Sequence, residues 1–238
     1  MQRELKGSLY YLQANLRYSF IIFWSIMIGT LALTILADLL IKSEEGIIAF
    51  NFSIPIYIFG AIFGFHIVKN VIPFLIKMGV TRKSLFISTG ILLCGISLIN
   101  SVIANTIHSS LERVYGDTMG GFISYSDGNI TLTITHFADL FMDSTWISRV
   151  FIDMSLTFFF ISLTLILGLI FYRYGLIGGF GTLGVVMLMF ILAISRGWVT
   201  SFFVKLFENF HFTFFYQLFA VGIIIYLLSF ILMRRITI

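Results

Sequence analysis

Residues that support catalysis or metal binding are few in this 238-residue chain, and their spacing favours no familiar chemistry. Two adjacent carboxylates, Glu44 and Glu45, fall in a short loop without a helical histidine partner. The chain contains neither the phosphate-binding pattern G-x-x-x-x-G-K-[ST] nor the nucleophile pattern G-x-S-x-G. The histidines lack metal-ligand spacing; they are His66, His108, His136 and His211. We therefore expect no active site, no metal and no cofactor in this chain.

Ionisable residues also avoid the centres of the long apolar stretches. Asp38 and Asp153 fall at the outer ends of such stretches, while His66 and Lys69 fall at an inner end. An ion-coupled carrier or proton pump usually needs ionisable groups near the bilayer centre, so the pattern weighs against both. The single cysteine, Cys94, excludes an internal disulfide framework.

The composition indicates a membrane protein. Hydrophobic residues make up 59% of the chain, charged residues make up 11%, and the mean hydropathy is +1.03. Soluble domains carry about 25% charged residues. The net charge of +4 fits basic cytoplasmic loops better than a polyanionic partner, so we expect no binding to nucleic acid.

Six apolar stretches are long enough to cross about 30 Å of hydrocarbon. A tight hairpin around residues 173–175 must separate the fourth stretch from the fifth, because together they are too long for one straight crossing. The expected fold class is an all-α integral membrane protein with a single transmembrane domain over residues 1–238. The expected spans cover residues 18–41, 46–68, 84–107, 150–172, 175–195 and 211–233.

The basic residues orient these spans. With both termini in the cytoplasm, ten of the fifteen Lys and Arg residues lie on the cytoplasmic side, and Glu4 is the single acidic residue there. The opposite orientation would reverse this two-to-one bias. We therefore expect a multi-pass protein of a bacterial plasma membrane with cytoplasmic N- and C-termini.

The segment before the first span, residues 1–17, is predicted to form a basic amphipathic elbow helix in the cytoplasmic interface. Its leucines recur at helical spacing, while Arg3, Lys6 and Arg17 lie largely off that stripe. A soluble N-terminal tail is the alternative interpretation. The leucines of the stripe are Leu5, Leu9, Leu12 and Leu16.

The cytoplasmic segment between the second and third spans is too short to cross a membrane and too apolar for a free loop. Pro73 favours the start of a short helix, and Gly79 favours its end. Such a helix would present apolar side chains to a cytoplasmic partner or to headgroups, although an ordinary basic connection is the alternative. The candidate coupling residues are Val71, Phe74, Leu75, Lys77, Met78, Gly79 and Arg82.

The long outer segment, residues 108–149, is able to form a small extracellular structure. Phe122–Ser126 and Ile130–Thr135 alternate apolar and polar residues around an Asp-Gly-Asn turn, which predicts a β-hairpin. A second outer segment, residues 196–211, carries apolar residues at helical spacing and predicts an amphipathic helix on the outer leaflet.

Glycines four residues apart predict close helix packing. Gly60 and Gly64 form such a pair in the second span, and Gly175 and Gly179 form another at the start of the fifth. Each pair predicts a contact within the chain or with a second chain, although glycine is common in membrane helices.

Taken in order, these segments resemble the permease subunit of an ATP-binding-cassette (ABC) exporter of the type-2 class. The resemblance covers nearly the whole chain: an elbow helix, six spans, a coupling helix after the second span, a tight inner turn after the fourth and amphipathic outer helices. Its most sequence-like part is residues 78–86, Met-Gly-Val-Thr-Arg-Lys-Ser-Leu-Phe, which looks like the stretch that enters the third span in small permeases of this class.

The resemblance implies that residues 71–79 dock into a cleft on a separate ABC ATPase, which would bind ATP and Mg²⁺. Two permease chains, identical or related, and two ATPases would form the working unit. Polysaccharide exporters of this class usually have short outer loops, whereas residues 108–149 are long and acidic. That departure favours export of an amphipathic substrate, such as an antimicrobial or cytolytic peptide or a lipid-like or drug molecule.

Two other classes of protein fit parts of the pattern. A membrane sensor or immunity protein would bind a ligand through the outer hairpin and transport nothing. An ion-coupled secondary carrier would need coordinating backbone carbonyls in place of charged side chains.

Overall fold

The structure is a computed structural model that describes residues 2–40, 46–115, 118–119, 122–126, 130–140, 145–201, 204 and 212–234. Most of the described chain is helical, and one small sheet at an end of the helices departs from a purely α fold. Five of the described helices are long and apolar enough to cross a membrane. The sequence-based expectation of long apolar helices is therefore confirmed.

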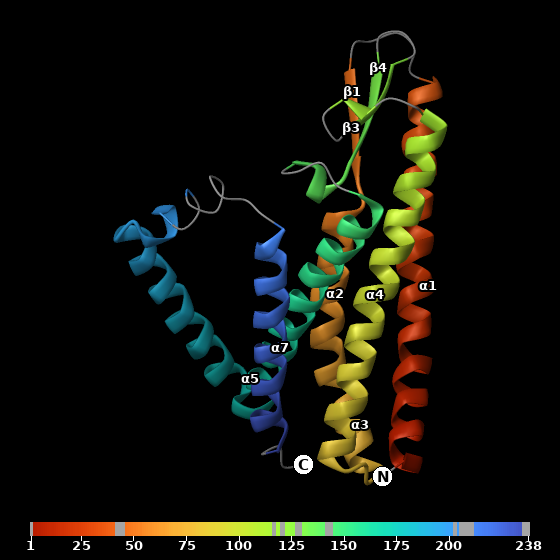
Figure 1. Ribbon diagram of the computed structural model, residues 1–238. Helices are drawn as coiled ribbons and strands as arrows, with labels where there is room; N and C mark the ends of the chain where they lie inside the picture. The colour runs from red at the N-terminus through yellow and green to blue at the C-terminus, as the bar shows by residue number, and fades with distance from the viewer. Residues whose placement is uncertain are drawn as a thin grey trace.

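The helix α1 (Gln2–Leu40) is continuous over 39 residues, so the prediction of a separate elbow helix over residues 1–17 is wrong. No glycine or proline occurs between Gly7 and Gly29 to break the helix. One residue of the leucine stripe, Leu12, packs on protein: it is only 1% exposed and belongs to the main apolar cluster. Figure 1 shows α1 as a straight rod at the margin of the bundle.

The second predicted span begins later and ends later than expected. Helix α2 (Ser53–His66), the π-helical turn η1 (Ile67–Val71) and α3 (Ile72–Lys77) follow one another without a break. Pro73 lies in the first turn of α3, directly after the π-helical turn, in which the backbone N–H of Ile72 donates to the carbonyl oxygen of Ile67. The irregular turn thus lies where proline removes a donor from the helical ladder. The expected coupling helix is therefore the lower end of this rod and not a separate element.

The sheet lies at the end of the bundle opposite the two termini (Figure 1). Its strands, in the order β1-β4-β3-β2, are β1 (Gly46–Asn51), β4 (Ile130–Thr135), β3 (Phe122–Ser126) and β2 (Thr118–Met119). Strands β3 and β4 form the antiparallel hairpin with the predicted bounds, which confirms that prediction.

Strand β1 contradicts the prediction that residues 46–51 open the second span. It pairs parallel to β4, from Gly46 beside Ile130 to Asn51 beside Thr135. Its apolar sequence runs directly into that of α2, and its pairing partner lies about eighty positions later, so hydropathy alone could not separate strand from span.

The helix α4 (Arg82–Tyr115) exceeds the predicted span of residues 84–107 by two turns at its outer end. The chain then passes through the sheet and a short 3-10 helix, η2 (Phe137–Leu140), to reach α5. The outer segment predicted at residues 108–149 therefore begins inside a helix.

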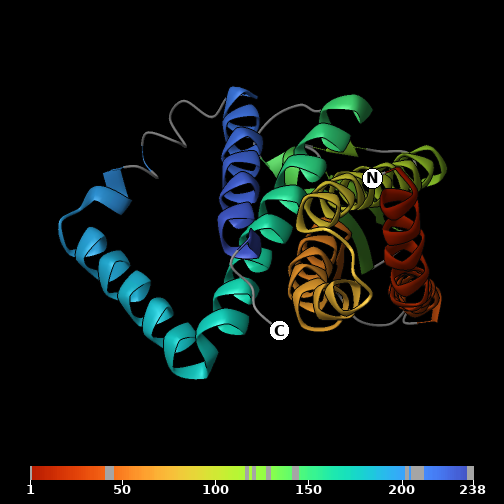
Figure 2. The same cartoon turned by 90° about the horizontal axis from the view of Figure 1, so that it is seen from below.

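The helix α5 (Trp146–Ser195) is divided by Gly175, whose φ of 69° and ψ of −171° are not helical. This break confirms the turn predicted near residues 173–175. The first limb of α5 (residues 146–174) and the second limb (residues 176–195) diverge, and the second limb stands away from the rest of the bundle in both views (Figures 1 and 2).

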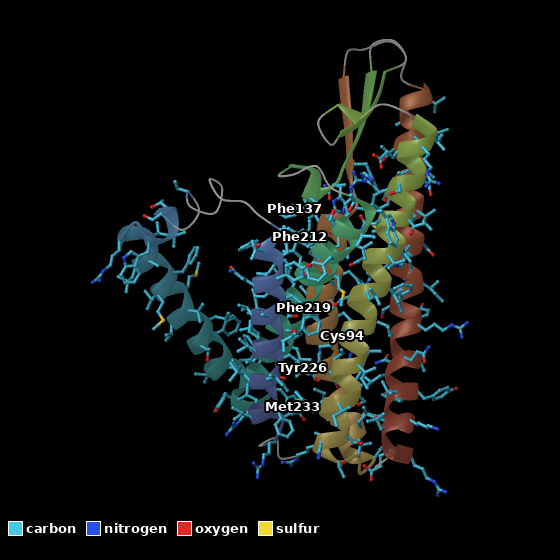
Figure 3. The ribbon with its side chains drawn as sticks, viewed as in Figure 1. Cys94, Phe137, Phe212, Phe219, Tyr226 and Met233 are labelled. Atoms are coloured by element: carbon cyan, nitrogen blue, oxygen red, sulfur yellow. The ribbon has the colours of Figure 1, made fainter. Side chains whose placement is uncertain are left out.

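The last helix, α7 (Thr213–Arg234), packs along the first limb of α5. Aromatic side chains make this contact, and the ring centroids of Phe158 and Phe219 are 5.2 Å apart. Figure 3 shows Phe219, Tyr226 and Met233 following one another down α7. Most of the outer amphipathic helix predicted at residues 196–211 lies outside the described residues, although residues 198–201 are helical.

Candidate functional site

The predicted coupling residues lie at the end of the bundle that also holds both chain termini (Figure 1). They divide into two groups. Val71 and Leu75 are 1% and 3% exposed and belong to the main apolar cluster. Phe74 and Met78 are 41% and 68% exposed, and Lys77 beside them is exposed as well. The first pair anchors the segment, while the second group forms a surface that a partner can reach.

This exposed surface, which we call the inner tip (Phe74, Lys77, Met78 and Gly79), ends in a turn. Gly79 has a φ of 82°, which favours glycine, and it is exposed. Beside the tip lies a cavity of about 400 Å³, lined on one side by Glu4 and Tyr11 of α1. The tip is therefore an exposed, partly apolar surface with a hollow between it and α1.

Three contacts tie the coupling segment to other helices. The ring of Phe74 stacks on Tyr11 of α1 with a centroid distance of 4.4 Å. Thr81 Oγ1, just before α4, donates to Glu4 Oε2 of α1 at 3.0 Å. Arg82, the first residue of α4, donates to the carbonyl oxygen of Arg234 at the end of α7. The inner tip thus contacts α1 directly, and Thr81 and Arg82, which follow it, connect the start of α4 to α1 and α7.

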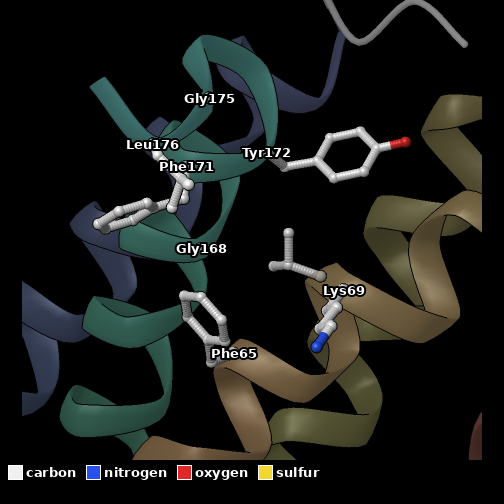
Figure 4. Close-up of a pocket in the computed structure, with 8 residues that line it drawn as sticks. Phe65, Lys69, Gly168, Phe171, Tyr172, Gly175 and Leu176 are labelled. Carbon is white, nitrogen blue, oxygen red and sulfur yellow. The ribbon is translucent and has the colours of Figure 1, made fainter. Parts of the chain in front are cut away.

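A second hollow of about 320 Å³ lies where α2 and η1 face the turn of α5 (Figure 4). Phe65, Phe171 and Tyr172 supply aromatic walls, and Lys69 adds a single ammonium group. The rings of Phe65 and Phe171 meet edge to face at 6.2 Å. Aromatic walls beside one cation suit an apolar body that carries a negative group.

The glycines predicted to pack helices lie in different surroundings. A Cβ at Gly60 would come within 3.0 Å of Ile161, and a Cβ at Gly64 would lie 2.5 Å from the carbonyl oxygen of Ile161. Both glycines therefore lie where α2 crosses the first limb of α5. A Cβ at Gly179 would overlap the ring of Phe171, so this glycine lies at a contact between the two limbs.

Gly175, by contrast, has no atom within 4 Å of an added Cβ, and it forms the turn itself. Glycine is required here by the backbone conformation, because residues with a Cβ rarely adopt a φ of 69°.

At the opposite end of the helices, a group of buried polar side chains surrounds Asp153, which has no exposed surface. Tyr57 of α2 donates its hydroxyl to Asp153 Oδ1 at 2.6 Å. Asn105 of α4 donates to Asp153 Oδ2 at 2.8 Å, and His136 Nε2 lies 2.9 Å from the same oxygen. We call these four residues the outer polar cluster.

The hydrogen bonds define the tautomer of His136. The backbone N–H of Ala138 donates to His136 Nδ1 at 3.1 Å, so Nδ1 carries no hydrogen. Nε2 therefore holds the proton and donates it to Asp153. Because both ring nitrogens are engaged, His136 is positioned to fasten the chain after β4 to α5, and it has no free nitrogen for acid–base catalysis.

A second layer lies one turn further out. Arg149 of α5 is only 6% exposed and lies 3.1 Å from both His108 Nδ1 and Glu112 Oε2 on α4. A guanidinium group can only donate, so His108 Nδ1 accepts. Asp153, Arg149 and Glu112 therefore each have a polar partner within the chain.

Sequence reasoning missed the outer polar cluster because its members come from four separate segments. A local signal was present, however: Asn105, His108 and Glu112 share one face of α4, and Arg149 and Asp153 share one face of α5. Polar residues spaced three or four apart at the ends of two apolar helices indicate a polar contact between them.

The described residues contain no group of three or more His, Cys, Asp or Glu side chains able to hold a metal ion. Comparison with protein-family models, with curated proteins and with solved structures found no match to this chain.

Proposed function

We propose that this chain is the membrane-embedded permease subunit of an ABC exporter, driven by a separate ATPase that docks on the inner tip. The observation that carries the proposal is the inner tip itself. It presents Phe74, Lys77 and Met78 to the surroundings, and Phe74 stacks on Tyr11 of α1. Thr81 and Arg82, which follow the tip, hydrogen-bond to α1 and α7 at the start of α4. A partner that pushes on the tip would act on α1 directly and on α4 and α7 through these neighbouring residues.

The spacing of polar residues supports a bilayer crossing. Asp153 and Arg173 are twenty residues apart along α5, and Tyr57 and Lys77 are twenty residues apart along the rod of α2, η1 and α3. At 1.5 Å per residue, both intervals are about 30 Å, the thickness of the hydrocarbon layer. The proposed membrane therefore lies between the outer polar cluster and the basic inner end, with both termini in the cytoplasm.

The second limb of α5 supports a working unit with two permease chains. Its apolar side chains are unusually open: Ile177 is 92% exposed and Leu176 is 71% exposed. With lipid on one side, a second permease chain would cover the other side and enclose a path between the two chains. The second chain would be either another copy of this permease or a related permease.

The hollow at the turn of α5 supports an amphipathic substrate. It combines three aromatic rings with the Lys69 ammonium group near the proposed cytoplasmic face (Figure 4). A peptide or lipid-like molecule with an apolar body and a negative group would fit both features.

The test is affinity purification of the tagged full chain from membranes in mild detergent, with captured proteins identified by mass spectrometry. We expect an ABC ATPase without membrane spans to accompany the wild-type chain. The double change Lys77→Glu with Met78→Asp should remove it, because both side chains are exposed and neither supports the core.

The matched control is Lys6→Glu, which reverses an exposed basic residue on α1 near the same end. It should retain the ATPase. Equal recovery of an ATPase from the double variant and the wild type would refute docking on the inner tip, and recovery of none from the wild type would refute the function.

One observation favours a different class, the membrane sensor or immunity protein. The sheet is fastened to the helices through His136, and the backbone N–H of Phe137 donates to Ser53 Oγ at the start of α2 at 3.4 Å. A ligand held by the sheet would therefore act directly on α2 and α5. This alternative predicts that the inner-tip variant keeps full function and that no ATPase is captured.

A further inference from the structure

The continuity of α1 places one charged residue in an unexpected position. Arg17 was expected at the cytoplasmic surface, but in the structure it lies well inside the long apolar helix, sixteen residues after Met1. Its side chain is exposed, and among the described residues it has no ion pair or hydrogen bond.

The register between α1 and α4 gives the depth of Arg17. Trp24 Nε1 donates to Asn100 Oδ1 at 3.0 Å, so these two residues lie at the same level. The two helices run in the same direction (Figure 1). Arg17 lies seven residues, about 10 Å, before Trp24, whereas Lys83 lies seventeen residues, about 25 Å, before Asn100. Arg17 is therefore about 15 Å above the inner end of α4.

That depth is about half of a hydrocarbon layer of roughly 30 Å. A charged arginine there is unfavourable by several kcal/mol unless it finds a counter-ion or reaches the interface by snorkelling. No carboxylate among the described residues forms an ion pair with Arg17, so a counter-ion from outside the chain would satisfy it.

A groove of about 410 Å³ opens beside this residue, between α1 and α4. The α4 wall is apolar throughout, and on the α1 wall Gln13 lies one turn to the cytoplasmic side of Arg17. The groove thus combines a long apolar surface with one amide and one guanidinium group. The residues lining it are Leu9, Gln13, Leu16, Arg17, Phe20, Ile91, Leu92, Gly95, Ile96 and Ile99.

We propose that this groove holds an anionic phospholipid of the cytoplasmic leaflet, with its phosphate on Arg17 and Gln13 and an acyl chain along α4. In this arrangement the long Arg17 side chain would reach toward the headgroups, and the phosphate would be drawn inward to meet it, as occurs when arginine thins a bilayer locally. The inference rests on the proposed membrane placement of the helices and is independent of the ATPase partner.

A second copy of this chain fits the groove less well. A copy would have to supply a carboxylate at the depth of Arg17, but the predicted spans contain few acidic residues. Asp153 is fully buried and already accepts three hydrogen bonds, and Asp38 lies near the outer end of α1. A lipid phosphate supplies the missing negative charge together with an apolar chain for the groove.

The test uses the purified full chain in mild detergent, stripped of lipid and then mixed with phosphatidylglycerol or phosphatidylcholine that carry identical acyl chains. Native mass spectrometry counts the lipids bound to each chain. We expect about fivefold tighter binding of phosphatidylglycerol, the selectivity that one arginine near anionic headgroups provides.

Three variants identify the site. Arg17→Gln should abolish the preference for phosphatidylglycerol. Gly95→Leu should reduce binding of both lipids, because Gly95 lines the groove and an added Cβ there meets no atom within 4 Å, so the new side chain fills the groove without disturbing the helix. Arg3→Gln, which removes the same charge at the start of α1, should behave as the wild type does.

Equal binding of the two lipids by the wild type would overturn the proposal, as would an unchanged preference in Arg17→Gln. Unchanged lipid binding with a loss of dimer in Arg17→Gln would assign the groove to a contact between chains instead. None of these results depends on whether an ATPase is captured, so the two proposals fail separately.

Discussion

Asp153 and Arg17 are both charged residues on long apolar helices, but they differ in burial and in the number of their hydrogen-bond partners. Asp153 has no exposed surface and accepts hydrogen bonds from Tyr57, Asn105 and His136. Arg17 is exposed and has no partner among the described residues. Hydrogen bonds place Asp153 of α5 against α2 and α4, whereas Arg17 belongs to α1, which Figure 1 shows at the margin of the bundle.

This difference separates structural polar groups from those that are available to another molecule. A buried group with every bond satisfied inside the chain stabilises the fold and offers nothing to a ligand. An unpartnered charge on a long apolar helix is a candidate binding site. The same distinction applies to apolar surfaces, because the inner tip and the second limb of α5 are exposed while the interior of the bundle is closed.

The largest effect is expected from Asp153→Asn. The change keeps the volume and leaves an amide oxygen for Asn105 and His136, while the Tyr57 hydroxyl must reverse to accept from the new N–H₂ group. Three hydrogen bonds to a charged group, worth about 1.5–3 kcal/mol each, become bonds to a neutral group worth about 0.5–1.5 kcal/mol each, so we expect a loss of about 3–4 kcal/mol of stability. Thermal unfolding in detergent measures it.

Tyr57→Phe is the matched control for this prediction. It removes one of the three donors to Asp153 and keeps the ring, so the loss should be smaller, about 1.5–3 kcal/mol. A melting temperature for Asp153→Asn within one or two degrees of the wild type would contradict a structural role for the outer polar cluster.

An intermediate effect is expected from adding a methyl group at the crossing of α2 and α5. In Gly64→Ala the new Cβ would lie 2.5 Å from the backbone carbonyl oxygen of Ile161, so the helices must separate. Overpacking of this kind typically costs about 1–3 kcal/mol, measured by the same unfolding experiment.

Gly95→Ala provides the comparison at the margin, since a Cβ there meets no atom within 4 Å. Alanine has the higher helix propensity, so this variant should be neutral or slightly more stable than the wild type. If Gly95→Ala were as destabilising as Gly64→Ala, the contrast between a closed core and an open groove would be wrong.

The smallest effect on stability is expected from Arg17→Gln. In detergent without added lipid, an exposed side chain with no partner contributes little, so the change should stay within about 0.5 kcal/mol. A loss of stability comparable to that of Asp153→Asn would mean that Arg17 has a partner within the chain. The distinction between a partnered Asp153 and an unpartnered Arg17 would then be wrong.

Periodicity and local turn chemistry predicted much of this fold. The hairpin of β3 and β4 follows from alternating apolar and polar residues on both sides of the Asp-Gly-Asn sequence, and the break at Gly175 follows from the length of the apolar run around Arg173. Both signals are continuous along the chain and need no knowledge of contacts between distant segments.

The misses share a different cause, which is tertiary contact. Residues 46–51 become a strand because β4 is available as a neighbour, and residues 2–17 continue α1 because Leu12 packs into the core. The outer polar cluster also depends on contacts between distant segments, since Asp153 meets Tyr57 across almost a hundred residues. The one local indication of this cluster is the spacing of polar residues on α4 and α5.

For the inner tip, the sequence identified the segment but not which of its residues are accessible. Val71 and Leu75 have the same apolar character as Phe74 and Met78, yet the first two are buried and the last two are exposed. That division depends on how the rod of α2, η1 and α3 rotates against α4 and α5, which hydropathy does not encode.

The central claim is that an ATPase binds the exposed residues of the inner tip, and cysteine cross-linking in native membranes tests it most directly. After the single native cysteine is removed by Cys94→Ala, Met78→Cys and Leu75→Cys each introduce one thiol on the same short segment. Met78→Cys should form a cross-linked product with an ABC ATPase, whereas the buried Leu75→Cys should not. Absence of an ATPase product at position 78, or an equal yield at position 75, would contradict the account.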